Sequence, residues 1–177
     1  MANQAALIII KPDALKHGLM GAVLSKLEPL QCEIIGAKVL RVSQELAEAH
    51  YEHIRGKPFF NETVAHLRGK LHGIEYVVAF VFWGPDAIER VRQVTGATNP
   101  EKADPQSIRG ALGRLTSSGL MENVLHASSD PADAEREIRL WFKSSELLRD
   151  PFGMGADQGA RAATSPHLPA RRWHPRS

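Results

Sequence analysis

A histidine near the three-quarter point of the chain stands where a side chain could do chemistry. His126 lies in ENVLHASSD, residues 122–130, directly after a short apolar run that looks like a strand. Near neutral pH an imidazole can be a general base, a metal ligand or the acceptor of a phosphoryl group. A single histidine is more often a core residue satisfied by one hydrogen bond, so its neighbours decide the interpretation.

The residues that follow His126 favour a chemical role. Ala127 and Ser128 are small and leave room beside the ring for a bulky substrate. Glu137 falls on the helix expected next, where its carboxylate could hydrogen-bond one ring nitrogen. Such a bond fixes the tautomer and leaves the lone pair of the other nitrogen free to attack.

Three cationic residues could supply a phosphate site. Lys11 ends the first expected strand, and Arg92 and Arg109 could each grip an anion with two N–H groups. Ordinary solvated charge explains Lys11 equally well, and it is the more common explanation for any single Arg. The chain has neither a Walker A loop nor the Gly-rich loop of protein kinases, so phosphate chemistry here would need other groups.

Other patterns carry less weight. His50 and His53 stand three apart on an expected helix, but no third metal ligand is evident, so packing or surface roles are favoured. GMGADQG (153–159) lacks the GxGxxG spacing and follows no strand, which argues against a dinucleotide fingerprint. The terminal ARRWHPR could bind nucleic acid or acidic lipid, although a solvated terminus is the simpler explanation.

Composition favours a folded intracellular protein. The length of 177 residues indicates one domain and an appendage, and 43% hydrophobic residues are enough for a sizeable core. Cys32 is the single cysteine, so no intrachain disulfide can form. The N-terminus lacks a secretory signal pattern, and the longest apolar runs are too short to span a bilayer. We therefore expect a cytoplasmic location and no membrane partner.

The positive charge of the chain is concentrated at its end. Residues 155–177 hold four Arg and one Asp, so this segment carries +3 while the whole chain carries +2. The basic isoelectric point thus belongs to the tail, and any nucleic-acid binding would run through the tail alone.

The elements that must position these residues follow from the hydrophobic pattern. Apolar, β-branched and aromatic runs predict strands, whereas apolar residues three and four apart predict helices. Ser43 and Asp130 are expected N-caps, with Pro131 at the first position of the last helix, and Asn61 is expected to cap the third helix. The predicted strands are 5–10, 33–42, 74–83 and 123–127, and the predicted helices are 19–30, 44–54, 61–68, 87–95 and 131–142.

This order predicts an α+β fold. Without its small helices it is the ferredoxin-like βαββαβ sandwich, in which helices cover an antiparallel four-stranded sheet. Residues 96–121 show no periodicity, which is typical of a loop that is either functional or disordered. We expect a catalytic domain at 1–152 and a flexible Gly/Pro/Arg-rich tail at 153–177.

Several blocks of the sequence, in this order, resemble nucleoside diphosphate kinases. The match covers roughly residues 5 to 148, and its K-P-D and N-x-x-H blocks together are highly specific. The blocks are IIIKPDAL (8–15) with HGLMG (17–21), KPFF (57–60), ATNP (97–100), SIRG (107–110) and NVLHAS (123–128) with AEREI (134–138).

The resemblance implies a reaction and a set of partners. It implies ping-pong transfer of the γ-phosphate from a nucleoside triphosphate, typically ATP, to a nucleoside diphosphate, with His126 as the nucleophile. It also implies a homo-oligomer, with dimer, tetramer and hexamer left open. Mg²⁺ would bridge the nucleotide's phosphates rather than sit in a protein cage, in keeping with its preference for waters and phosphate oxygens.

The resemblance also implies roles for individual residues. Glu137 and Ser128 match the groups that hold the nucleophile. Phe59 matches the residue that stacks on the nucleotide base, a contact that every base can make because every base has a π-face. Asn123 matches a sugar contact. The residues that match phosphate contacts, or lie near the phosphates, are Lys11, Tyr51, Arg92, Thr98 and Arg109.

This sequence departs from the family pattern in several places. The family usually has a small residue, Ser and Asp after the histidine, whereas here Ser129 precedes the carboxylate of Asp130. Lys57 stands where Arg is common. GKLHG (69–73) and GRLTSSG (113–119) look like insertions or altered loops, and the basic tail has no counterpart.

Two further readings stay open beside an active kinase. The altered residues and loops motivate a nucleotide-binding regulatory protein of the same fold with weak or absent transfer, and the tail motivates nucleic-acid binding.

Overall fold

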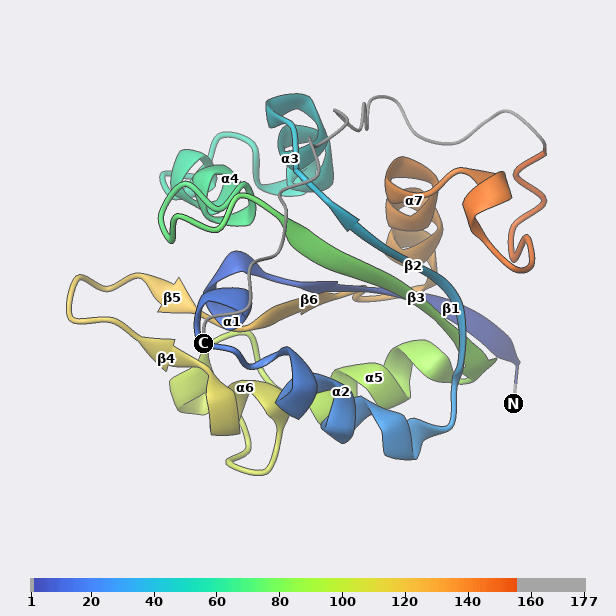
Figure 1. The fold of residues 1–177 in the computed structure, drawn as a ribbon, viewed down its shortest axis with the longest axis horizontal. Helices are drawn as coiled ribbons and strands as arrows, with labels where there is room; N and C mark the ends of the chain where they lie inside the picture. Colours follow the sequence, from blue (N-terminus) through green and yellow to red (C-terminus); the bar gives the residue numbers. More distant parts are fainter. Residues whose placement is uncertain (1, 156–177) are drawn as a thin grey trace, which may run out of the picture.

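The computed structural model describes residues 2–155, and most of the tail predicted at 153–177 lies outside this range. Four strands form one antiparallel sheet in the order β2-β3-β1-β6 (Figure 1). Two short strands, β4 (Arg114–Leu115) and β5 (Met121–Glu122), pair as a separate hairpin. The sheet strands are β1 (Asn3–Ile10), β2 (Glu33–Leu40), β3 (Val77–Pro85) and β6 (Leu125–Ala127).

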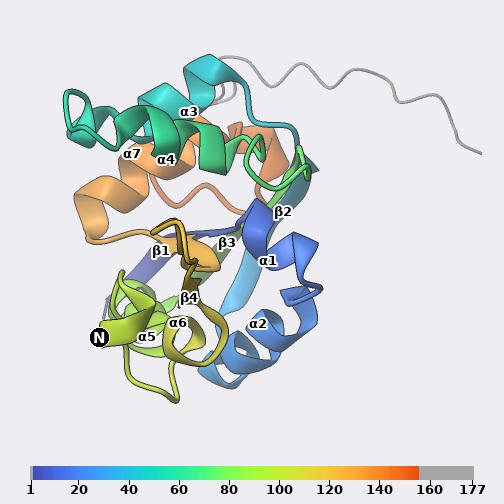
Figure 2. The same cartoon turned by 90° about the vertical axis from the view of Figure 1, so that its left-hand side faces the viewer.

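Helices cover both faces of this sheet, as the two views show (Figures 1 and 2). Helices α3, α4 and α7 lie over one face, and α2, α5 and α6 lie over the other. The bounds are α1 Pro12–Lys16, α2 Met20–Leu27, α3 Gln44–His50, α4 Phe60–Leu67, α5 Ala87–Thr95, α6 Ile108–Leu112 and α7 Pro131–Trp141, with 3-10 turns η1 Glu28–Leu30, η2 Glu52–Ile54, η3 Pro100–Lys102 and η4 Ser144–Glu146.

Strand β1 is the centre of the core because it pairs on both sides and is covered on both faces. Leu7 and Ile9 pack with the first helical layer, whereas Ile8 and Ile10 pack with the second. Burying such a side chain stabilises the fold by about 1.5–3 kcal/mol relative to leaving it exposed. This burial fixes the register of β1. It therefore also fixes the position of Lys11, which follows the last residue of the strand.

The α+β sandwich predicted from the sequence is confirmed, and so are two of its helix starts. Ser43 accepts a hydrogen bond from the Leu46 N–H at 3.1 Å. Asp130 accepts one from the Asp133 N–H at 2.9 Å. Such caps contribute about 1 kcal/mol each and fix where the helices α3 and α7 begin.

Three local predictions differ from the structure. Asn61 does not cap α4, because the helix begins at Phe60 and the residue before it is Phe59. The helix predicted at 19–30 is observed as α2 followed by the 3-10 turn η1, and α1, which was not predicted, begins at Pro12 just after β1. Residues 96–121 contain η3, α6 and the β4–β5 hairpin, each too short to produce a visible period.

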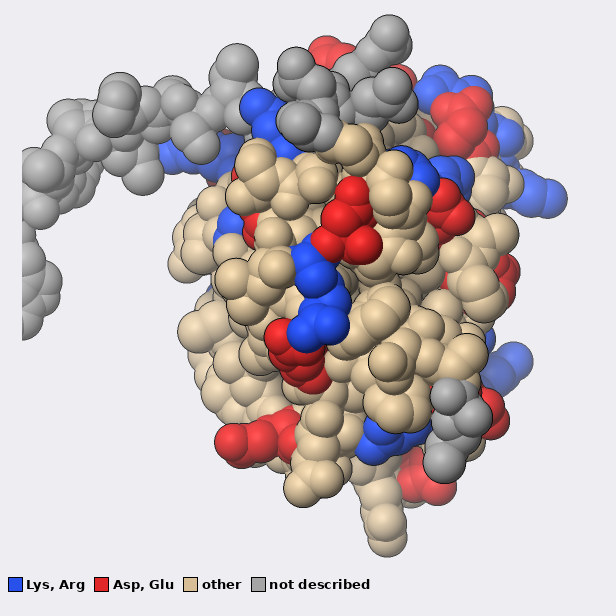
Figure 3. Space-filling view, turned by 90° about the vertical axis from the view of Figure 1, so that its right-hand side faces the viewer, with Lys and Arg blue, Asp and Glu red and all other residues tan. Residues whose placement is uncertain are grey.

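The surface of the described residues shows mixed charge. On the face drawn in Figure 3, basic and acidic side chains alternate rather than gather. Near the end of the described chain, Arg149 pairs with Glu33 at 2.7 Å and Lys38 pairs with Glu146 at 2.7 Å. No helix within residues 2–155 combines the length and apolar character that crossing a membrane requires.

Candidate active site

Lys11 and Asn123 form the floor of the candidate site. Lys11 follows the last residue of β1, and its Nζ donates a hydrogen bond to Asn123 Oδ1 at 2.7 Å. The Asn123 side-chain amide in turn donates to the Thr98 carbonyl at 3.1 Å. Lys11 and Asn123 are both buried, so Lys11 is not the solvated strand-end charge that is common at such positions.

A strained turn places Asn123 and His126 on the same edge of the sheet. Val124 has a φ of 71°, a left-handed value that is rare for a β-branched residue. The Leu125 N–H donates to the Asn123 carbonyl at 2.8 Å, which closes a three-residue turn around Val124. Asp13 holds this turn by accepting from the Val124 N–H at 2.8 Å. Strain of this kind persists only where the surroundings impose it, and it is typical of functional sites.

Arg109 reaches the same place from helix α6. Its guanidinium donates to the carbonyl oxygens of Asn123, Gly96 and Leu125, at 3.3, 3.1 and 2.9 Å. A guanidinium has five N–H donors, so two remain for an anion. Only glycine fits at position 96, whose carbonyl accepts from Arg109. Its φ is +84°, and a Cβ at that position would lie 2.2 Å from Ser107 Oγ.

His126 projects from β6 towards a buried carboxylate on α7. Its Nε2 lies 2.9 Å from Glu137 Oε1, although the N–H does not point squarely enough at that oxygen to form a good hydrogen bond. The other carboxylate oxygen of Glu137 accepts from Ser128 Oγ at 2.7 Å. Within residues 2–155 the His126 Nδ1 has no hydrogen-bond partner, which leaves its lone pair available.

The surroundings keep the His126 ring neutral. Burial, together with the charges of Lys11 and Arg109, holds the pKa of His126 well below its usual value. Burial also raises the pKa of Glu137, a tendency that His50 and the Ser128 hydrogen bond oppose. A neutral imidazole is the nucleophilic form, so this electrostatic setting suits attack on phosphorus.

Burial also lowers the pKa values of the two cations of the site, Lys11 and Arg109. It lowers the pKa of Lys11 to about 8, with a further lowering from Arg109 and an opposing contribution from Asp13. Burial and the neighbouring Arg92 lower the pKa of Arg109 to about 10. Both side chains are therefore positive at neutral pH but gain from an incoming anion, which is the property of a phosphate site.

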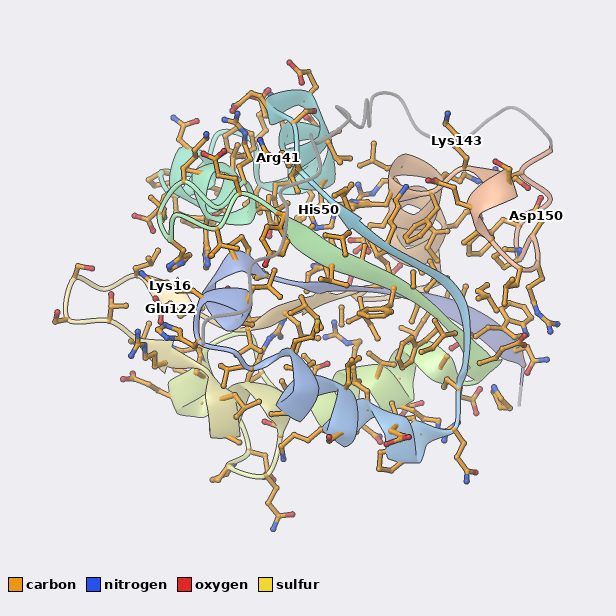
Figure 4. The ribbon with its side chains drawn as sticks, in the orientation of Figure 1. Lys16, Arg41, His50, Glu122, Lys143 and Asp150 are labelled. Carbon is orange, nitrogen blue, oxygen red and sulfur yellow. The ribbon has the colours of Figure 1, made fainter. Side chains whose placement is uncertain are left out.

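His50 is a part of the site that the sequence did not reveal. It is fully buried, and its ring meets the His126 ring edge to face with centroids 4.4 Å apart. The Trp141 Nε1–H donates to His50 Nδ1 at 3.2 Å, so the neutral ring carries its proton on Nε2. Figure 4 labels His50 below α3, facing the interior. Surface or packing roles were expected; the surface role is wrong, and no sequence signal pointed to His126 as the neighbour.

The remaining predicted residues lie around this centre with fewer contacts. Tyr51 is buried beside His50, with ring centroids 4.7 Å apart, and burial raises its pKa. Phe59 precedes α4 and exposes about half of its side chain. Arg92 and Thr98 are exposed. Arg92 is close enough to influence Arg109 electrostatically, but no hydrogen bond joins it to the other predicted residues within the described chain.

A surface hollow borders the site without containing its centre. Its volume is about 640 Å³. Arg92 and Ser129 are among the lining residues, but neither Lys11 nor His126 is. Arg92 thus lines this hollow and is also near enough to Arg109 to lower its pKa.

Ser129 and Asp130, where the sequence departs from the family pattern, both make hydrogen bonds to α7. Ser129 Oγ donates to the Asp133 carboxylate, one turn into α7. Asp130 caps the same helix. Asp133 lies close enough to His126 to favour its charged form. A carboxylate therefore still lies near His126, but it belongs to Asp133 and not to residue 129.

Comparison with known proteins places the chain in a family. The model of the nucleoside diphosphate kinase family matches residues 4–147. The nucleoside diphosphate kinase of Moorella thermoacetica is 41% identical over 147 residues, which are 83% of this chain and 99% of that protein. The corresponding enzyme of Pyrococcus horikoshii is 42% identical over 149 residues, 84% of this chain and 91% of that protein.

Solved structures of the same kind share the fold. The nucleoside diphosphate kinase of Borrelia burgdorferi, in a transition-state mimic with vanadate and ADP, has a TM-score of 0.74 and 34% identity, covering 88% of this chain and 96% of that one. The enzyme of Halobacterium salinarum in complex with CDP has a TM-score of 0.75 and 34% identity, covering 88% and 97%. The chain belongs to the nucleoside diphosphate kinase family.

Proposed function

We propose that this chain moves the γ-phosphate of a nucleoside triphosphate to a nucleoside diphosphate through a phosphohistidine at His126. The observation that carries the proposal is the pairing of the two ring nitrogens. Nε2 faces the buried Glu137 at 2.9 Å, and Nδ1 has no hydrogen-bond partner within the described chain. A neutral ring held by one nitrogen and open at the other is the arrangement that nucleophilic attack requires.

The first half-reaction follows from this geometry. The Nδ1 lone pair attacks the γ-phosphorus, the bond from phosphorus to the bridging oxygen breaks, and the nucleoside diphosphate leaves with that electron pair. The Nε2 proton stays on the ring, so positive charge develops there. Glu137 stabilises this charge and is itself positioned by Ser128 at 2.7 Å. The second half-reaction is the reverse of these steps with a different acceptor diphosphate.

The cations stabilise the charge of the transferred group. Lys11 and Arg109 are buried or partly buried and lie close enough to depress the pKa of His126. Phosphoryl transfer depends mainly on positioning and electrostatic stabilisation, which these residues supply before the nucleotide arrives. Arg92 adds a third positive charge from the exposed face of α5.

The other residues would orient the nucleotide. Phe59 offers an exposed aromatic face for the base, and stacking of this kind accepts every base. Asn123 would contact the sugar, while Thr98 and Tyr51 would contact or border the phosphates. These assignments rest on the family pattern and on the positions of the residues around His126.

A divalent metal fits the site if it arrives on the nucleotide. The two carboxylates next to the phosphate cations each hold a protein partner with one oxygen, since Asp13 accepts from the Val124 N–H and Glu137 accepts from Ser128. Mg²⁺ prefers waters and phosphate oxygens, so it needs no protein cage here. Carried by the nucleotide, Mg²⁺ would supply positive charge against the charge that builds up on the leaving diphosphate.

The remaining features of the proposal concern organisation. We propose a catalytic domain over 1–152, a separate tail over 153–177, a cytoplasmic location and a homo-oligomer. Exposed apolar side chains on the edge strand β2, Ile34 and Val39, support association between copies. Light scattering of the purified chain would give the oligomer mass and choose among dimer, tetramer and hexamer.

Labelling with γ-³²P-ATP tests the proposed reaction. The wild type is expected to take up an acid-labile label that ADP or another diphosphate removes, and His126→Ala is expected to take up none. His53→Ala, which replaces an exposed histidine, is the matched control and should label normally. Label that survives His126→Ala would refute the proposal. Normal nucleotide binding with negligible labelling of the wild type would favour the regulatory alternative.

A further inference from the structure

A second group of histidines lies outside the catalytic centre. Asp13 on α1, His66 on α4 and His72 in the loop after α4 are all buried. Each offers one potential ligand atom, and these atoms lie within 4.8 Å of one another. The reaction proposed above uses none of the three as a chemical group, and the family resemblance gives them no role.

Two of these ligands already have the separation that a metal requires. His66 Nε2 lies 3.2 Å from Asp13 Oδ1. Ligand atoms around a tetrahedral zinc ion are about 3.3 Å apart, given metal–ligand distances near 2.0–2.1 Å. The rings of His66 and His72 have centroids 4.8 Å apart, so a modest shift of His72 would complete a three-ligand set.

His72 has an unsatisfied nitrogen in this buried place. Within the described chain its Nε2 has no hydrogen-bond partner. Its Nδ1 lies 3.6 Å from Glu122 Oε1. A histidine that binds a metal through one nitrogen commonly directs the other towards a carboxylate, which fixes the ring. An unpaired buried nitrogen is otherwise costly, so its presence calls for a partner.

Glu122 is the carboxylate that faces His72, and other side chains fix its position. Its Oε2 accepts from Arg114 Nε at 2.5 Å and lies 3.5 Å from His17 Nε2. This leaves Oε1 on the side of His72. Figure 4 labels Glu122 at the end of the molecule where the β4–β5 hairpin meets α1.

The loops that complete the cluster are those that depart from the family pattern. His72 lies in GKLHG (69–73), and the hairpin that carries Arg114 includes GRLTSSG (113–119). The first loop is rigidly shaped, because the Gly69 carbonyl accepts from the N–H groups of His72 and Gly73. Gly69 has a φ of +79°, and a Cβ there would lie 1.7 Å from the Ile74 carbonyl oxygen. The loop therefore presents His72 in a defined position.

We propose that Asp13, His66 and His72 bind a divalent transition-metal ion of the zinc class, with Glu122 supporting His72. Two imidazoles and one carboxylate suit zinc and its neighbours rather than magnesium or calcium, which prefer oxygen ligands. A water would take the fourth position. This ion is distinct from the metal carried by the nucleotide.

Such an ion would connect two parts of the nucleotide site. His66 belongs to α4, which Phe59 directly precedes. Asp13 lies two residues after Lys11, and its Oδ2 holds the strained turn at Val124. The metal would therefore tie the helix next to the base-stacking residue to the segment that positions Asn123 and His126. Its primary effect is on stability rather than on the chemical step.

Zinc binding by the full-length chain tests the proposal. Protein stripped with a chelator would be titrated with Zn²⁺ by calorimetry, with Mg²⁺ as a comparison and Co²⁺ absorption as a spectroscopic readout of tetrahedral ligands. We expect one Zn²⁺ per chain and a Tm that rises by about 5–10 °C at a hundredfold excess over Kd. His72→Gln should weaken binding by on the order of 100-fold or more.

Three variants locate the ion. His72→Gln keeps a polar side chain of similar reach, and His72→Ala repeats the test by removing the side chain altogether. His126→Ala removes the other histidine cluster, formed with His50 and Glu137, and should retain Zn²⁺ binding. Unchanged affinity in folded His72→Gln, or loss of the ion in His126→Ala alone, would overturn the proposal, as would binding of no Zn²⁺ by the wild type.

Discussion

The ionisation of Lys11 gives the proposed mechanism a measurable pH dependence. Burial lowers the pKa of this ammonium to about 8, and its Nζ sits on Asn123 at the floor of the site. If Lys11 must be positive to receive the phosphates, free enzyme with neutral Lys11 will not be phosphorylated efficiently. The second-order rate constant for phosphorylation, which reports the free enzyme, should then follow the charged fraction of Lys11.

The size of the effect follows from the pKa of Lys11. With a pKa of about 8, roughly nine-tenths of the lysine is charged at pH 7, half at pH 8 and about one-eleventh at pH 9. The rate constant should therefore fall about tenfold between pH 7 and pH 9. At saturating ATP the phosphates next to Lys11 raise its pKa, so the fall should move to higher pH.

Quenched-flow mixing with subsaturating γ-³²P-ATP would measure this rate constant in a single turnover. Lys11→Arg is the matched variant, because a guanidinium stays charged across this range. We expect Lys11→Arg to be slower at pH 7 but to lose the decline above pH 8. A wild-type rate constant that is flat between pH 7 and pH 9, or an equal decline in Lys11→Arg, would refute the reasoning.

Three further substitutions test other parts of the site. Glu137→Gln should slow phosphorylation of His126 by about 10- to 100-fold, because a charge-assisted contact contributes about 1.5–3 kcal/mol; an unchanged single-turnover rate would contradict this. Phe59→Ala should raise the KM for the acceptor diphosphate by about tenfold through loss of stacking, and steady-state kinetics showing an unchanged KM would exclude that role. Asp130→Ala should lower the free energy of unfolding by about 1 kcal/mol in urea and leave the phosphorylation rate within about twofold; loss of activity at full stability would make Asp130 more than a cap.

The sequence predicted the parts of the fold that depend on local pattern. The strands and the longer helices follow from apolar periodicity, and the caps at Ser43 and Asp130 follow from side chains that accept backbone N–H bonds. These signals are local, so a single sequence carries them in full. The order of the elements was then enough to predict the antiparallel sheet between helices.

The shorter elements could not be predicted because their stability is not local. Helix α1 has five residues and depends on Asp13, which is held by His66 from far along the chain. The β4–β5 hairpin has two residues in each strand. Neither element is long enough to show a period, and both are kept by contacts that only the fold brings together.

The active site was predicted in type but not in full detail. The motif order pointed to His126, Lys11 and Arg109, and the structure brings these residues together. It also adds His50 against His126, and a strained turn at Val124 that an ordinary strand pattern had concealed. Both features depend on tertiary contacts, so they leave no mark on the residue spacing.

The contacts of Ser129 bear on whether its departure from the family pattern weakens phosphoryl transfer. A hydroxyl replaces the carboxylate usual in the family, but Ser129 donates to Asp133, and Asp133 favours the charged form of His126. Negative charge near the histidine is therefore retained from the next turn of α7. This observation supports an active kinase over a weakened one.

The most direct test is to determine which nitrogen of which histidine carries the phosphoryl group. Protein labelled with ¹⁵N-histidine and phosphorylated by ATP can be examined by ¹H–¹⁵N and ³¹P NMR. Because Glu137 faces the Nε2 of His126, we expect a phosphorus–nitrogen bond at Nδ1 of His126. Phosphorus on Nε2, or on the neighbouring His50, would contradict it.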